Sequence, residues 1–137
     1  DIQQSELITH KLISQIIDPL RQNDDSLSMS ERAARLIAIN FLYLHQYNSL
    51  IPNDLLCDIA DVVFSQISPS SEFSSDRHIV NVCFEFIVNF FRCAKPDMLN
   101  SYLEMITCSI TNLPEQHRTK YRLKIRTILV KLVRKYG

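Results

Sequence analysis

The stretches DLLCDIADVVFSQI (residues 54–67) and DMLNSYLEMITCSI (residues 97–110) decide the fold, because the second repeats the pattern of the first 43 positions later. Apolar residues recur in both at intervals of three and four, the spacing of one face of an α-helix. An acid opens each stretch, at Asp54 and at Asp97. The other matched pairs are Leu56 and Leu99, Ile59 and Tyr102, Asp61 and Glu104, Val62 and Met105, Val63 and Ile106, and Ile67 and Ile110. The two stretches predict a repeated helix.

A second helix follows each of these stretches and is repeated as well. Residues 80–91 match residues 125–136 at an offset of 45. Residues 34–42 match residues 80–88 more weakly, at an offset of 46. Two helices in a unit of 43 to 46 residues are typical of HEAT and armadillo repeats. The alternative is that unrelated amphipathic helices have been aligned by their common spacing.

Working outward from these stretches, the apolar spacing predicts six helices. Their ranges are 3–21, 29–48, 53–67, 76–94, 97–112 and 115–136. Ser28 with Glu31 predicts a capping box, Pro114 opens the last helix, and the only glycine is Gly137. We expect an all-α, HEAT/armadillo-like helical-repeat solenoid in one segment, residues 1–137, made of three antiparallel helix pairs. The pairs are 3–48, 53–94 and 97–136.

The helix at 76–94 is apolar around most of its circumference and has one polar stripe. The stripe consists of Asn81, Glu85, Asn89 and Arg92. A helix of this kind needs neighbours on several sides, as in the middle of a stack. Because the chain begins without Met and ends directly after a helix, we expect it to be part of a longer solenoid. Leu123 and Val130 are then candidates for exposed apolar surface.

Composition indicates a globular protein, with 46% hydrophobic and 22% charged residues. The four cysteines have no CxxC spacing and are expected to be thiols in a reducing compartment. No apolar run is long enough to cross a membrane, and no signal peptide is recognisable. The serines of residues 68–75 are a candidate phosphorylation site.

Charge is the strongest indication of function. From Pro114 onward there are eight basic residues and one acid, Glu115, whereas the preceding 113 residues carry a net charge of minus seven. On a helical wheel five cations share an arc of about 100° opposite an apolar stripe. These cations are Lys120, Lys124, Lys131, Arg134 and Lys135, and the stripe is Tyr121, Ile125, Ile128, Leu129, Leu132 and Val133. Arg122 and Arg126 are expected to pair with acids of neighbouring helices.

The basic face has three interpretations. It can hold nucleic-acid phosphates without reading sequence, or dock an acidic protein surface. It can also be a solvated face near a helix C-terminus, where the dipole favours lysine. No aromatic residue is interleaved with these cations to stack on bases.

No catalytic constellation is recognisable. The four histidines lie on four different predicted helices and are expected to be surface or helix-end residues; they are His10, His45, His78 and His117. No HExxH motif or Cys/His cluster has the spacing of metal ligands. We therefore expect no enzyme activity, no metal, no cofactor and no small-molecule substrate. A small helical enzyme is a third alternative and would require a pocket with convergent titratable groups.

The C-terminal half resembles the ribosomal-RNA-processing protein twelve family. The resemblance rests on Ser74 to Val80 (SSDRHIV), on Phe84 and Phe86 to Val88, and on the basic closing segment KYRLKIRTILVKLVRKYG, residues 120–137. It covers about half of the chain. It implies a long HEAT-repeat, karyopherin-like factor of the nucleolus and nucleus that shuttles to the cytoplasm. The partners it implies are pre-ribosomal RNA and ribosome-assembly proteins. The repeat pattern separately predicts contact with neighbouring repeats of the parent chain, and the lack of a long apolar run predicts no membrane contact.

We expect a non-catalytic scaffold in pre-rRNA processing and in pre-ribosomal subunit assembly or export. Its basic last helix would contact RNA or an acidic partner. The alternative is a protein-binding HEAT/armadillo adaptor or transport-receptor segment that recognises a peptide or helix in its groove.

Overall fold

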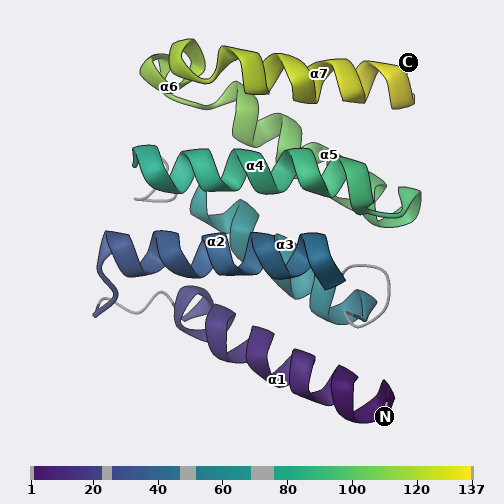
Figure 1. The fold of residues 1–137 in the computed structure, drawn as a ribbon. Helices are drawn as coiled ribbons and strands as arrows, with labels where there is room; N and C mark the ends of the chain where they lie inside the picture. The colour runs from purple at the N-terminus through teal and green to yellow at the C-terminus, as the bar shows by residue number, and fades with distance from the viewer. Residues whose placement is uncertain (1, 23–25, 47–51, 69–75, 137) are drawn as a thin grey trace. The chain divides into compact units, whose positions relative to one another are not determined.

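The computed structural model describes residues 2–22, 26–46, 52–68 and 76–136, and its helices are drawn in Figure 1. They are α1 (Ile2–Arg21), α2 (Met29–Gln46), α3 (Asn53–Gln66), α4 (Arg77–Cys93), α5 (Pro96–Thr111), α6 (Glu115–Lys120) and α7 (Arg122–Tyr136). The described ranges contain no strand. The all-α prediction is confirmed. The predicted helix 115–136 is instead two helices, α6 and α7. The candidate phosphorylation loop lies outside the described residues from position 69 to 75.

The chain divides into two compact units, residues 1–63 and residues 64–137. The boundary falls inside α3, so the last turn of that helix belongs to the second unit. The continuous solenoid over residues 1–137 stays a prediction.

In the first unit α1 packs against α2. The buried apolar residues of both helices follow the spacing of three and four that one helix face requires. They are Ile13, Ile17 and Leu20 on α1, and Leu36, Ile39 and Tyr43 on α2. The far end of α1 is different, because Leu7 and Ile8 are exposed there.

A proline and an arginine join α1 to α2. Pro19 lies inside α1 and has no N–H, so the Gln15 carbonyl loses its helical donor. Arg35 of α2 supplies a donor in its place: its Nη1 lies 3.1 Å from the Gln15 carbonyl oxygen and 3.0 Å from that of Ile16. The guanidinium therefore replaces the missing backbone hydrogen bond from a second helix.

The core of the second unit is aromatic. The Phe64 ring stacks on Tyr102 with centroids 5.5 Å apart and meets Phe90 edge-on at 5.9 Å. Phe86 packs against both Phe64 and Phe90. Ring pairs of this kind stabilise by about 0.5–1.5 kcal/mol each beyond the area they bury. The cluster ties the end of α3 to α4 and α5.

Helix α4 lies at the centre of the second unit and packs against α5 and α7. Its buried residues are Ile79, Val80, Val82, Cys83, Phe84, Phe86, Ile87, Phe90 and Phe91. The predicted polar stripe is confirmed, because Glu85 and Arg92 are exposed while Asn81 and Asn89 are half-buried. The helix begins at an Asp76 cap, whose Oδ1 accepts a hydrogen bond from the Ile79 N–H at 3.0 Å.

Of the two hydrogen bonds that a capping box contains, the start of α2 forms the one from the Glu31 backbone to the Ser28 side chain. The Ser28 Oγ accepts a hydrogen bond from the Glu31 N–H at 3.1 Å. Ser28 therefore caps α2 in the way that Asp76 caps α4.

The four cysteines are free thiols in different surroundings. Cys83 is fully buried, and desolvation raises its pKa. Cys93 is half-buried; desolvation raises its pKa, and the charge of Arg92 offsets part of that shift. Cys108 is exposed.

Candidate nucleic-acid interface

The basic segment is bent at Tyr121, between α6 and α7. Tyr121 has φ −104° and ψ 20°, outside the α-helical region. Backbone hydrogen bonds nevertheless continue across the bend, from the Tyr121 N–H to the His117 carbonyl and from the Ile125 N–H to the Tyr121 carbonyl, both at 2.9 Å. The segment is therefore kinked rather than interrupted. Lys120 lies on α6 and does not share the wheel of α7.

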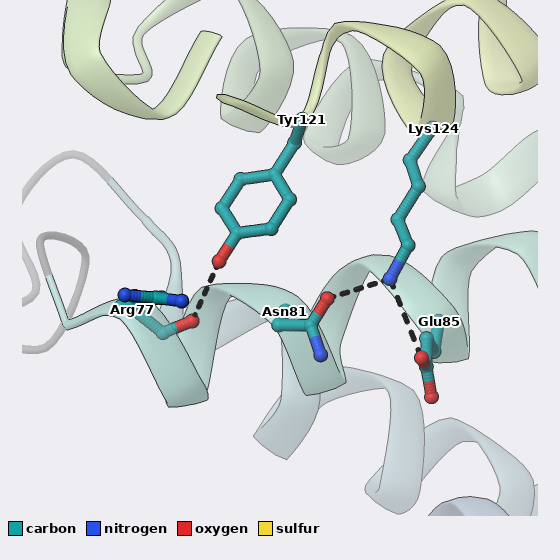
Figure 2. Close-up of polar contacts among 5 residues, drawn as sticks. All are labelled: Arg77, Asn81, Glu85, Tyr121 and Lys124. Carbon is teal, nitrogen blue, oxygen red and sulfur yellow. Dashed lines mark hydrogen bonds and ion pairs between the residues drawn. The ribbon is translucent and has the colours of Figure 1, made fainter. Parts of the chain in front are cut away.

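Contacts of the Tyr121 side chain explain the bend. Its hydroxyl donates a hydrogen bond to the Arg77 carbonyl oxygen at 3.0 Å, as Figure 2 shows. Its ring packs on Phe84 of α4, with centroids 5.6 Å apart, and stacks on His117 at 6.1 Å. His117 is thus buried inside the unit, so the prediction of a surface histidine is wrong, although His117 does lie in the last turn of the short helix α6.

Lys124 points toward α4 rather than into solvent (Figure 2). Its Nζ donates a hydrogen bond to the Asn81 Oδ1 at 2.6 Å and lies 3.3 Å from the Glu85 Oε1. It also lies 6.0 Å from the centroid of the Tyr121 ring, within cation–π range. The charge of Lys124 is therefore engaged inside the unit.

The orientation of α7 differs from the predicted one. Tyr121, Lys124 and Ile128 follow one another at spacings of three and four and form the side that packs on α4. The far edge of the predicted apolar stripe is open as a result, because Leu129 is 46% exposed and Val133 is 66% exposed. The side of α7 that contacts α4 is thus the edge where the basic face meets the apolar face, and not the middle of the apolar face.

The other predicted cations have separate surroundings. Lys131 is half-buried, and Arg134 and Lys135 are exposed near the end of α7. Arg134 lines a groove on the open side of the helix. The expected ion pairs of Arg122 and Arg126 are not formed with any acid in the described part of the chain.

Arg77 joins the candidate interface, although it is not among the cations that the helical wheel brings together. It is exposed at the first position of α4. Desolvation and the positive charge of Arg77 both lower the pKa of Lys120. Lys120 directly precedes Tyr121, whose hydroxyl is bonded to the Arg77 carbonyl oxygen. Neither Arg77 nor Lys120 forms an ion pair with a described acid. The one feature of the sequence that could have marked Arg77 as a site residue is its position within SSDRHIV, a segment on which the family resemblance rests.

The Lys120 side chain also contacts an aromatic ring. Its Nζ lies 5.7 Å from the Tyr121 ring centroid. Lys120 and Lys124 thus approach one ring, but only Lys124 has a carboxylate partner in the described structure. Lys120 remains available for an external anion.

Among the described residues no group of three or more His, Cys, Asp or Glu side chains is placed to hold a metal ion. No described helix combines the length and apolarity that a membrane span requires. Comparisons of the chain with protein-family models, with curated proteins and with solved structures found no match.

Proposed function

We propose that the chain is a non-catalytic helical-repeat scaffold of ribosome assembly, and that it holds RNA phosphates where α6 and α7 meet the start of α4. One observation carries the proposal: the Tyr121 hydroxyl, bonded to the Arg77 carbonyl oxygen, holds the bend beside Lys120 at the start of α4, where Arg77 and Lys120 are exposed and have no described acid as partner. Two unpaired cations attract a phosphate, because binding relieves their repulsion and releases counterions from the RNA.

Further cations extend this surface along α7. Lys131 and Lys135 form no ion pair with a described acid. Lys131 and Lys135 are four residues apart on α7, about 6 Å along its axis, and Lys120 lies before the bend, so the cations on the two sides of the bend can hold separate phosphates of one RNA strand. Lys124 is left out of the proposed contact, since its ammonium is engaged by Glu85 and Asn81.

The proposed architecture is a HEAT/armadillo-like solenoid. Support comes from the offset of 45 between residues 80–91 and 125–136, because the two matched segments lie on helices α4 and α7, which pack side by side within one unit. Neighbouring second helices of a repeat array pack in this way.

The assignment to ribosome assembly is supported by the resemblance described above, whose best-matching part is the closing segment at residues 120–137. That segment also contains most of the proposed RNA contacts. Pre-ribosomal RNA and assembly proteins are the proposed partners, and the nucleolus and nucleus are the proposed location.

The test is binding of a structured RNA to the chain at about 50 and 200 mM salt. We expect the affinity of the unmodified chain to fall steeply with salt, since each phosphate contact contributes about 0.7–0.9 to the slope of log affinity against log salt. The variant Arg77→Gln with Lys120→Gln should therefore lower the slope by about 1.5. Lys131→Gln with Lys135→Gln should lower it by a similar amount.

A matched control removes two exposed lysines elsewhere. Lys11 lies on α1 and Lys95 precedes α5, and both are exposed. Lys11→Gln with Lys95→Gln should leave the slope unchanged. The proposal is wrong if the unmodified chain does not bind at about 50 mM salt, or if the control lowers the affinity as much as Arg77→Gln with Lys120→Gln.

A further inference from the structure

The open side of α7 forms a groove of about 550 Å³. Its apolar lining comes from the end of α5 and from α7, and includes Ile110, Ile125, Leu129 and Val133. Leu129 and Val133 are among the most exposed large apolar side chains of the second unit. An apolar surface of this kind is typical of a site that another molecule covers.

Arginines flank the apolar residues of the groove. The four are Arg118, Arg122, Arg126 and Arg134. No acid lines the groove, and none of the four forms an ion pair with an acid in the described ranges. The surface therefore favours an occupant that is apolar along one stripe and acidic beside it.

The packing of α7 on α4 shows how such a surface is covered. Phe84 of α4 is fully buried and packs against Tyr121, the residue directly before α7. At the repeat offset of 45, Phe84 corresponds to Leu129 and Asn81 corresponds to Arg126. A helix lying on α7 as α7 lies on α4 would thus cover Leu129.

The repeat offset also indicates which charge the covering helix needs, and that charge is opposite to the charge of Lys124 on α7. Asn81 presents an acceptor oxygen, and α7 meets it with Lys124. The corresponding Arg126 presents only donors, so the covering helix needs a carboxylate where α7 has a lysine. An RNA strand fits this groove less well, because its lining has no aromatic ring on which a base could stack.

We propose that this groove binds an amphipathic helix of a partner protein, with an apolar stripe on Leu129 and Val133 and acidic residues facing the arginines. Arg122 and Arg134 lie 12 positions apart on α7, about 18 Å along the helix or about three turns, and Arg118 lies on α6 before the bend. This surface is separate from the proposed RNA contact at Arg77 and Lys120, so either proposal can fail without the other.

The test uses two fluorescent designed peptides of about eighteen residues with the same leucine stripe at helical spacing. One carries glutamates beside the stripe and the other carries lysines. We expect the chain to bind the glutamate peptide, and Leu129→Ser with Val133→Ser to weaken binding by at least about tenfold. Both positions are exposed, and circular dichroism checks that the helices are retained.

Two further variants separate recognition from misfolding. Arg122→Glu with Arg126→Glu should reverse the preference, so that the lysine peptide binds and the glutamate peptide does not; an unfolded chain would not reverse it. Leu7→Ser with Ile8→Ser, at positions 71% and 67% exposed in the first unit, is the apolar control and should change nothing.

Three results would overturn the proposal. One is that neither peptide binds, or that both bind equally. Another is a dimer in sedimentation that Leu129→Ser abolishes, which would assign the groove to a second copy of the chain. The last is loss of RNA binding in Arg122→Glu with Arg126→Glu while Arg77→Gln with Lys120→Gln still binds RNA, which would make the groove the RNA site.

Discussion

The Tyr121 hydroxyl donates a hydrogen bond to the Arg77 carbonyl oxygen, 3.0 Å away and 44 positions earlier in the chain. The bond joins the bend between α6 and α7 to the first turn of α4. Because Lys120 directly precedes Tyr121, the same contact brings Lys120 close to Arg77. One tyrosine therefore contributes both to packing and to the arrangement of the proposed RNA-binding cations.

Tyr121→Phe should lower the free energy of unfolding by about 1 kcal/mol, since it removes one partly buried hydrogen bond and keeps the ring. Tyr121→Ala should cost about 3–5 kcal/mol, because it also removes the packing on Phe84 and His117. Urea denaturation followed by circular dichroism measures both values. Tyr136→Phe, at an exposed position, is the control and should be neutral. Equal losses for Tyr121→Phe and Tyr121→Ala would contradict this account.

Lys124→Met and Glu85→Gln should be coupled in a double-mutant cycle. The two side chains are 35% and 52% exposed, so solvent screens the pair and the coupling energy should be about 0.5–1 kcal/mol at low salt. About 1 M salt should reduce it. Lys124→Met should have little effect on RNA binding. A coupling energy of zero at low salt would show that the contact does not stabilise the protein.

The helix bounds and the all-α class could be predicted because apolar spacing reports directly which residues face a core. The bend at Tyr121 could not, since no proline or glycine marks it and its cause is a contact with Arg77 on another helix. The direction of Lys124 was missed for a similar reason. Its partners, Asn81 and Glu85, lie about forty positions away, and their location depends on how α7 packs.

The open edge at Leu129 and Val133 was also missed. A helical wheel identifies an apolar stripe but not which border of the stripe meets its neighbour. In this protein the border near Lys124 is the one that packs. Arg122 and Arg126, which flank the other border, were consequently assigned to internal ion pairs that the described residues do not form.

Asp76→Ala should destabilise α4 by about 1 kcal/mol, because it leaves the Ile79 N–H without its cap. Asp76→Asn and Asp76→Ser should retain most of that stability. Lys95 is a matched control: it is the N-cap residue of α5 but makes no side-chain cap bond, so Lys95→Ala should be nearly neutral. Thermal denaturation measures all four variants, and a neutral Asp76→Ala would argue against the cap.

The cysteines should react with a thiol reagent in the order of their exposure. At pH 8 Cys108 should react first, whereas Cys83 should react only after unfolding, because burial raises its pKa and blocks access. Cys93, whose pKa desolvation also raises, should react faster as the pH is increased. Mass spectrometry of alkylated peptides assigns each site. Modification of Cys83 at the rate of Cys108 in the folded protein would contradict its burial.

Arg35 and Pro19 have a consequence for how two helices choose their alignment. Apolar stripes tolerate a shift of one turn, because leucine and isoleucine side chains interchange with little loss. A backbone carbonyl left without a donor does not tolerate it, since a donor displaced by about 5 Å no longer reaches. The alignment of α1 with α2 is therefore specified by the Gln15 carbonyl of α1, which Pro19 leaves without a backbone donor, and by the Arg35 side chain of α2, which donates to it.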